Sequence, residues 1–267
     1  MADETGFVRV FFAYIVLAAL VFAIIAGGVV MGSSFIDSRL VDVGESVSKR
    51  ETIAADGIDA AMIEVIHSIG QLRIEGGGSD LIAGEFTYNV PELTPTIIYS
   101  DSGDFPLVTV THPETKFTLS AIPRPSQFNQ VLNIWDLSLN REVALDLHVT
   151  MGAAEGELTL SGLNLHNLLV EIGTGMVLID LSGDWSHNVQ VEVDGGVGEL
   201  ILLLPETVGV RVESHAAMSE VTTIGLEKEE DVYTNEIYGS ADVELDVEVN
   251  AGLGSIHLEV VTAEEEM

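Results

Sequence analysis

The sequence predicts an all-β protein, a β-solenoid of coils about 21 residues long, preceded by one transmembrane helix. Three observations support this fold class: a repeated short phrase, alternation of apolar and polar residues, and one long uncharged segment. The phrase is a pair of small residues followed by an alternating strand, and its copies begin at residues 152, 173, 196, 217 and 252. The steps between copies are 21, 23, 21 and 35 residues, and such a period is typical of stacked supersecondary units.

The uncharged segment comprises residues 10–31, which are 22 residues long. A helix of that length spans a hydrocarbon core of about 30 Å. A cleaved signal peptide would have a shorter apolar region after several basic residues, and a pilin-type leader cleaved after Gly6 would also need a preceding basic residue. We therefore expect a short tail over residues 1–9, an uncleaved anchor over residues 10–31, and a single-pass protein of the cell membrane.

The orientation of the anchor is read from the basic residues at its two ends. Arg9 precedes the segment, whereas Arg39, Lys49 and Arg50 follow it. The residues nearest the helix favour an amino terminus inside the cell, and the wider window favours the reverse. We expect the large domain to lie outside the cell.

The segment after the anchor divides into a linker and a β domain. Residues 32–59 read as a polar linker with weak strands at 40–43 and 47–53, and from Ala60 the apolar residues alternate strictly with polar ones. Alternation of this kind is typical of strands with one buried face. We therefore expect one β-solenoid domain over residues 60–267.

An irregular section interrupts the domain at residues 81–140. It contains short strand-like runs at 86–90, 96–99, 107–111 and 117–121, and six of the seven prolines. Proline is tolerated at turns and sheet edges but not in central ladders. The section is expected to form a packed layer of hairpins.

The repeats themselves favour a solenoid over other repeat folds. Each contains two strand-sized pieces around a small-residue corner, and about 21 residues are too few for a crossover helix. Leucine-rich repeats have a similar period, but their Asn or Cys ladder position is missing. We expect each coil to stack on its neighbour in sequence, with the acidic segment 227–239 projecting as a loop from the longest step.

The charge balance excludes several classes of partner. Asp and Glu number 43 against 10 Lys and Arg, which gives a net charge of −33. Nucleic-acid binding needs basic residues to displace counterions, so no nucleic-acid partner is expected. Anionic lipid surfaces are disfavoured for the same reason, and the acidity is typical of a protein adapted to high salt.

Motifs for catalysis are missing from the sequence. There is no Cys, and the seven His residues form no zinc-binding motif. No nucleophile elbow or phosphate-binding loop occurs, and the glycines around Gly196 lack the aspartate of calcium-binding nonapeptide repeats, because Leu200 stands there. We therefore expect a protein that is not an enzyme.

One constellation of carboxylates remains. If the coils stack in register, the residues four positions before the start of each repeat form one row. The residues two positions before the start of each repeat form a second row. These rows contain Glu192, Asp194, Glu213 and Glu248. Carboxylates stacked about 4.8 Å apart are either the solvent face of a salt-adapted sheet or a weak site for divalent cations, which prefer oxygen ligands.

Two stretches of the sequence resemble a known family. The runs SIGQLRIEGGGSDLIAGEFTYNVPELTPTIIYS and IWDLSLNREVALDLHVTMGAAEGELTLSGLNLHNLLVEIGTG are similar to the toast-rack domain of the cell-wall-active antibiotic response proteins, which are related to the Lia-system inhibitors of envelope-stress signalling. The resemblance implies a membrane-linked β-solenoid without catalytic residues. In some relatives it also implies restraint of a sensor histidine kinase through protein contact, although one membrane helix and extreme acidity depart from those members.

Together these observations predict a non-enzymatic, membrane-anchored envelope protein that presents its solenoid to a membrane-protein or envelope partner. One alternative is a surface structural or adhesive protein that forms homo-oligomers through its exposed solenoid ends. Another is a polysaccharide-acting enzyme, which would need clustered basic residues. After residue 77 the basic residues are few and dispersed.

Overall fold

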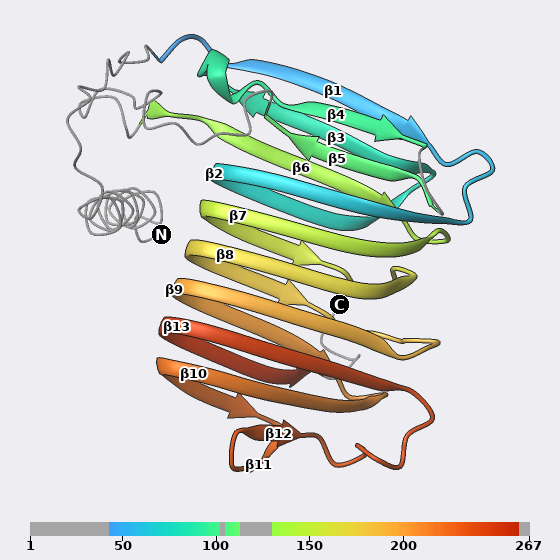
Figure 1. Ribbon diagram of the computed structural model, residues 1–267, viewed down its shortest axis with the longest axis vertical. Coiled ribbons are helices and arrows are strands. Elements are labelled where there is room, and N and C mark those ends of the chain that lie inside the picture. The colour runs from blue at the N-terminus through green and yellow to red at the C-terminus, as the bar shows by residue number, and fades with distance from the viewer. Residues whose placement is uncertain (1–42, 102–104, 113–129, 262–267) are drawn as a thin grey trace, which may run out of the picture.

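A computed structural model describes residues 43–101, 105–112 and 130–261 of the chain (Figure 1). Its strands join into one 13-stranded sheet that folds back on itself around a core. The single non-strand element in the described part is a short 3₁₀ turn, Pro91–Leu93. The predicted all-β class is confirmed.

Six long strands form the body of the molecule and run parallel to one another. Each bends sharply near its middle, so that it contributes one arm before the bend and one arm after it, called here the first arm and the second arm (Figure 1). The core lies between the two layers of arms. In chain order the six are β2 (Ala60–Gly78), β7 (Ala144–Thr159), β8 (Leu165–Asp180), β9 (Val189–Pro205), β10 (Gly209–Ile224) and β13 (Glu244–Val261).

The side-chain pattern of β8 explains how one strand serves both layers. Val170 and Ile172 on the first arm are buried, and so are Val177 and Ile179 on the second. The sequence spacing from Ile172 to Val177 is odd, whereas residues on one face of a straight strand are an even number apart. The small-residue corner between the two arms therefore reverses the alternation, so that both arms turn their apolar residues towards the core.

Glycine is required at this corner because the coils approach each other there through their backbones. Gly175, Gly198 and Gly254 have φ of 146°, 150° and 146°. A Cβ on Gly198 would lie 1.8 Å from the carbonyl oxygen of Gly175, and one on Gly254 would lie 1.8 Å from that of Gly198. The repeated glycines are therefore corners of the coil, as the sequence predicts.

The amino-terminal end of the stack is closed by shorter strands. On one side β6 (Asn133–Asn140), β3 (Asp80–Tyr88) and β1 (Val47–Ala54) extend the sheet from the second arm of β2. On the other side β5 (Leu107–Thr111) pairs with the first arm of β2, and β4 (Thr96–Ser100) pairs with β5. The expected hairpin layer is thus present, and the sheet begins in the expected linker, at β1, before residue 60.

Side-chain contacts join the outermost strands of this end. The backbone N–H of Ile97 on β4 donates to Glu51 Oε2 on β1 at 3.1 Å. Lys49 Nζ donates to the carbonyl of Pro95 at 3.2 Å. These bonds cover edges that would otherwise be open.

An aromatic cluster fills the core at this end. Trp135 is fully buried and packs edge-on against Phe86, with ring centroids 5.5 Å apart. Its other neighbours are His67 at 4.7 Å and His112 at 4.8 Å. Both histidines are buried, so the core contains two titratable rings.

The carboxyl-terminal end differs from the expected order of coils. The sheet order is β9, β13, β10, so the last described strand lies between two long strands that are consecutive in the stack's chain order (Figure 1). The expectation that every coil stacks on its neighbour in sequence is therefore wrong for β9 and β10. Both β9 and β10 pair in parallel with β13 over nearly its full length.

The segment expected as a projecting loop is also different. Its residues form a hairpin of β11 (Glu227–Glu229) and β12 (Val232–Thr234), and β12 pairs antiparallel with the first arm of β10. Tyr233 is only 3% exposed because its ring closes the end of the core. A loop that looked solvated is thus a cap, since one buried aromatic ring anchors it.

Two expectations fall on residues outside the described part. They are the transmembrane helix over residues 10–31 and the strand-like run at 117–121. In the described ranges, no helix has the length and hydropathy needed to cross a membrane.

Candidate functional site

The outward-facing residues of the first arms form straight rows across the stack, named here the first-arm face. The parallel pairing places each member of a row directly beside the next. The register is the one the small-residue corners predict. In spatial order one row is Glu64, His148, Leu169, Glu192, Glu248 and Glu213, and the next is Ile66, Thr150, Glu171, Asp194, Asn250 and His215.

The insertion of β13 changes which carboxylates are neighbours. Glu248 lies between Glu192 and Glu213, so three carboxylates follow one another without a break. At about 4.8 Å, two unit charges repel by roughly 1 kcal/mol even at the dielectric constant of water. The row needs neutralising neighbours or screening by salt.

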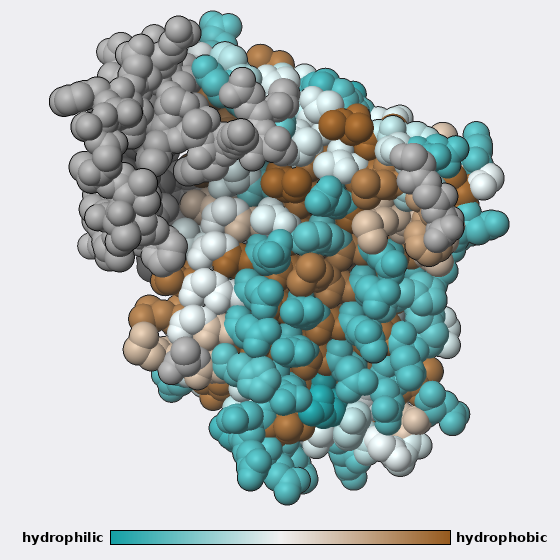
Figure 2. Space-filling view, in the orientation of Figure 1, coloured by the Kyte–Doolittle hydropathy of each residue, from teal (hydrophilic) through white to brown (hydrophobic). Residues whose placement is uncertain are grey.

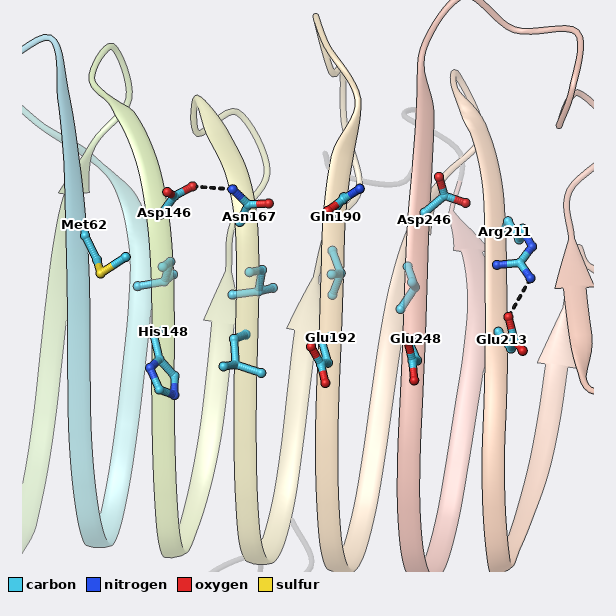
Figure 3. Close-up of a pocket in the computed structure, with 15 residues that line it drawn as sticks. Met62, Asp146, His148, Asn167, Gln190, Glu192, Arg211, Glu213, Asp246 and Glu248 are labelled. Carbon is cyan, nitrogen blue, oxygen red and sulfur yellow. Dashed lines mark hydrogen bonds and ion pairs between the residues drawn. The ribbon is translucent and has the colours of Figure 1, made fainter. Parts of the chain in front are cut away.

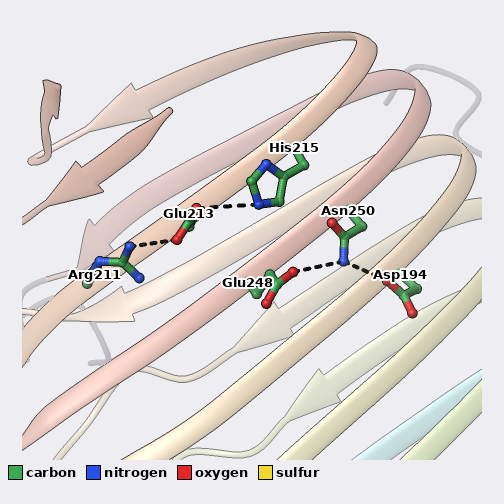
Figure 4. A network of polar contacts seen from close by, with 6 residues as sticks. All are labelled: Asp194, Arg211, Glu213, His215, Glu248 and Asn250. Carbon is green, nitrogen blue, oxygen red and sulfur yellow. Dashed lines mark hydrogen bonds and ion pairs between the residues drawn. The ribbon is translucent and has the colours of Figure 1, made fainter. Parts of the chain in front are cut away.

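Neutral and cationic side chains of the neighbouring positions supply part of that compensation (Figure 4). Arg211 Nη2 donates to Glu213 Oε2 at 2.6 Å, and His215 Nε2 lies 3.4 Å from the other oxygen of Glu213. Asn250 Nδ2 donates to Asp194 Oδ1 at 3.0 Å and to Glu248 Oε1 at 3.4 Å. An amide thus separates two carboxylates that would otherwise face each other.

These contacts shift the protonation of Glu213. The hydrogen bond from Arg211, together with the positive charge of that guanidinium and of His215, lowers the pKa of Glu213 below its ordinary value. Glu213 therefore stays ionised over the whole neutral and mildly acidic range. Glu192 has no hydrogen bond or ion pair with any other described residue, so its charge faces solvent.

A shallow groove runs along the first-arm face (Figure 3). It has a volume of about 590 Å³, and its walls are the first row and a third row two residues earlier on each strand. Asp146 in the third row accepts a hydrogen bond of 2.6 Å from Asn167 Nδ2. The lining includes five carboxylates, from Asp146, Glu192, Glu213, Asp246 and Glu248.

The surface around the groove matches this description. Figure 2 shows hydrophilic side chains gathered over the stacked strands, with a narrow strip of apolar surface between them. A face of this kind attracts cations and basic groups and repels polyanions.

One triplet on the same face looks like a catalytic arrangement but lacks its geometry. Glu171 Oε2 accepts from Thr150 Oγ1 at 2.9 Å and lies 2.8 Å from His148 Nε2. In a nucleophile–base–acid relay the histidine uses one nitrogen for the hydroxyl and the other for the carboxylate. Here the carboxylate occupies the nitrogen that a hydroxyl would need. The triplet holds Glu171 in place, and these bonds lower the pKa of Glu171.

The four carboxylates proposed as a cation ladder lie on one face, as the sequence predicts. Glu192, Glu248 and Glu213 occupy one row, and Asp194 lies on the adjacent row. Within the described ranges, no group of three or more His, Asp or Glu side chains converges closely enough to hold a metal ion. Binding of a divalent cation stays a prediction.

Sequence reasoning missed the third row and its only cation. Arg211 precedes Glu213 by two residues and so shares its face, and Asp146 and Asp246 occupy the same position on other strands. Counting two residues further back from each repeat would have found all three. Arg211 matters most because it pairs with the last carboxylate of the row.

A family match and one solved structure agree with this architecture. Residues 42–203 match the family described as the N-terminal domain of toast_rack, DUF2154. No curated protein matches the sequence.

The crystal structure of a candidate cell adhesion protein from Clostridium sporogenes is similar to this chain, with a TM-score of 0.74 and 25% sequence identity. The similarity covers 81% of this chain and 100% of that one. A candidate adhesin from Bacteroides fragilis has a TM-score of 0.30 and 11% identity, over 80% of this chain and 97% of the other. Another from Parabacteroides distasonis has a TM-score of 0.32 and 11% identity, over 84% of this chain and 100% of the other.

Proposed function

Because the chain belongs to the toast-rack family, we propose that it is a non-enzymatic, membrane-anchored envelope protein whose first-arm face contacts a partner protein, in envelope-stress signalling. The observation that carries the proposal is the face itself: straight rows rich in carboxylates on a parallel stack, with no catalytic arrangement among the described residues of that face. Parallel pairing over six strands fixes the spacing of these groups, so the face is preorganised. Preorganisation of this kind lowers the entropic cost of binding.

The basic residues of the described part argue against a polysaccharide-acting enzyme. Arg141 donates to the carbonyl of Gly76 at 2.9 Å, and Arg211 is paired with Glu213. Lys228 Nζ lies 5.0 Å above the ring of Tyr233. Each of these three is engaged in a separate structural contact, and Arg211, which lines the groove, is held by Glu213, so none of the three is free to act as a catalytic base.

Photo-crosslinking in native membranes tests the proposal. A photoreactive residue is placed at Glu192, which has no partner in the described part of the chain, and a matched one at the exposed Glu75 on the second arm of β2. We expect adducts with one envelope or membrane protein from position 192 and none from position 75. Equal labelling from both positions, or none from position 192, would contradict a dedicated face.

A second candidate function is adhesion at the cell surface. It is favoured by the similarity to the Clostridium sporogenes structure, which is described as a candidate cell adhesion protein and matches over its whole length. The same crosslinking separates the two functions when cells that carry the photoreactive protein are mixed with cells that lack it and whose proteins are isotopically labelled. Adducts with isotopically labelled proteins would favour adhesion between cells over a partner in the same membrane.

A further inference from the structure

The last coil has two different outer edges. On its first arm β10 pairs with β12, and the N–H of Ser214 donates to the carbonyl of Asp231 at 2.9 Å. From residue 215 onward, the end of the first arm, the corner and the second arm (residues 215–224) pair with β13 on one side, and no described strand pairs with them on the other. A row of backbone donors and acceptors is therefore open along this arm.

The two layers end at different levels as a result. Beyond β10 the first-arm layer continues through β12 and β11, whereas the second-arm layer stops at β10 (Figure 1). The carboxyl-terminal end of the stack is thus a step that is two strands deep. One added strand beside the second arm would continue that layer without displacing the hairpin.

The composition of the open edge differs from the rest of the molecule. Glu220 is its only carboxylate, in a chain with a net charge of −33. Met218 is 73% exposed and Ile224 is 52% exposed, and the residues between them include Val221 and two threonines. Natural edges are usually protected by lysine, proline or a covering element, and none of these is present in residues 215–224.

The opposite end of the stack shows that this chain does cover its edges elsewhere. There β1 and β4 are joined by the bonds of Lys49 and Glu51 described above. At the carboxyl-terminal end the first arm is covered by the β11–β12 hairpin. Among the six long strands, which the structure describes in full, only the second arm of β10 has an uncovered edge.

We propose that the second arm of β10 binds one extended strand of a partner protein by β-augmentation. The open backbone groups are satisfied by another extended backbone, and alternate side chains give specificity. Apolar residues of the partner would cover the exposed Met218 at the corner and the exposed Ile224 further along the arm, and a cation would lie opposite Glu220. The net charge of the chain favours a basic segment and opposes a second copy. This binding site is separate from the first-arm face.

Hydrogen–deuterium exchange with a defined peptide tests the proposal. The full chain, purified in detergent, is mixed with the nine-residue peptide KITVKVTIK, which alternates apolar and polar residues and carries cations. We expect saturable slowing of amide exchange, tenfold or more, within residues 215–224. The same peptide with N-methyl groups on alternate residues has the same side chains but fewer donors, and it should give no slowing.

Matched variants localise the effect. Met218→Lys with Ile224→Lys should weaken peptide affinity at least tenfold, because it places like charges on the edge. Val47→Lys with Ile98→Lys changes two exposed apolar residues at the other end, outside the groove, and should leave affinity unchanged. Glu192→Gln with Asp194→Asn should also leave it unchanged, which separates this site from the first-arm face. The proposal would be overturned if the peptide caused no slowing of exchange, or if the N-methylated peptide slowed exchange equally. It would also be overturned if exchange slowed without peptide as the protein concentration rose, because that result would assign the edge to a second copy of the chain.

Discussion

At the scale of single residues, the corner glycines carry the tightest geometric demand in the molecule. Gly198 combines φ of 150° with a hypothetical Cβ 1.8 Å from a backbone carbonyl. Real Cβ atoms do not approach backbone so closely, so the coils would have to separate. The absence of a side chain is required at one residue, but it allows the neighbouring coils to pair at their normal spacing.

We expect Gly198→Ala to lower the free energy of unfolding by about 3 kcal/mol or more, because it adds both backbone strain and a clash between coils. Gly57→Ala is the matched control, since Gly57 has φ of 75° but open space around its Cβ. That change should cost only about 1–2 kcal/mol of backbone strain. Urea denaturation followed by circular dichroism measures both, and equal losses would show that the clash is relieved without cost.

The buried histidines make stability depend on pH. Burial lowers the pKa of His67 to about 3, with a further contribution from His112, and lowers the pKa of His112 to about 4. The unfolded chain takes up these protons near pH 6.5, whereas the folded chain does not. The stability that the neutral rings contribute is therefore complete above pH 6.5 and is lost as the pH falls towards 3 to 4.

For His67 this loss amounts to about 1.4 kcal/mol per pH unit. We expect His67→Leu to reduce the slope of unfolding free energy against pH by about that amount between pH 6 and pH 4.5. His166→Leu, which removes an exposed ring, should keep the slope of the unchanged protein. Chemical denaturation at several pH values provides the data, and parallel curves for the unchanged protein and His67→Leu would contradict this account.

At the scale of elements, the rows of the first-arm face raise the question of cation binding. Calcium is expected to bind weakly between stacked carboxylates, because hard cations prefer oxygen ligands. Titration calorimetry at high salt should show a small saturable heat that disappears in Glu192→Gln with Asp194→Asn. The same titration with a monovalent salt is the control. If no saturable heat is measured, or if the double variant gives the same heat, the rows do not bind calcium and are only a solvent-exposed surface.

The register of these rows was predictable from sequence, and their order was not. Small residues at the corner are fixed by contact between neighbouring coils, so counting back from them correctly places Glu192, Glu213 and Glu248 in one row. The order within that row differs, because Glu248 and not Glu213 lies beside Glu192. The position of β13 between β9 and β10 depends on contacts between distant segments, which leave no local pattern in the sequence. The one indication in the sequence is the longer step of 35 residues between the last two repeats.

The cap at the end of the stack was missed for a related reason. In β11 and β12 most residues are polar, so the segment looks like a loop. Its fold depends on Tyr233, which is buried, and on Asn235, whose side chain bonds the backbone of Val208 and Val210. One aromatic ring and one amide are too few to give a periodic signal.

At the scale of the whole molecule, the net charge of −33 makes folding dependent on ionic strength. Repulsion between like charges opposes the compact state, and at 1 M salt the screening length falls to about 3 Å. The rows of carboxylates concentrate this repulsion on one face.

We expect the melting temperature to rise between 0.1 M and 2 M KCl. Replacing Glu192, Glu248 and Asp194 by their amides should raise the melting temperature at low salt and reduce the gain from KCl. Sucrose is the control, because it stabilises compact states without screening charge. An equal gain from KCl in the amide variant would place the repulsion elsewhere on the surface.

The insertion of β13 has a consequence for how the chain is made. Synthesis proceeds from the amino terminus, at roughly 5–20 residues per second. β10 therefore emerges before the strand that will separate it from β9, and the slot between them must stay vacant for roughly 2–7 s while residues 225–261 follow. The coils from β2 to β9 can form in the order of translation, but the final one closes from within, after β13 has been synthesised. A premature stop within β13 would leave β10 and its cap without an attachment to the body, and quality control can recognise such a product as unfinished.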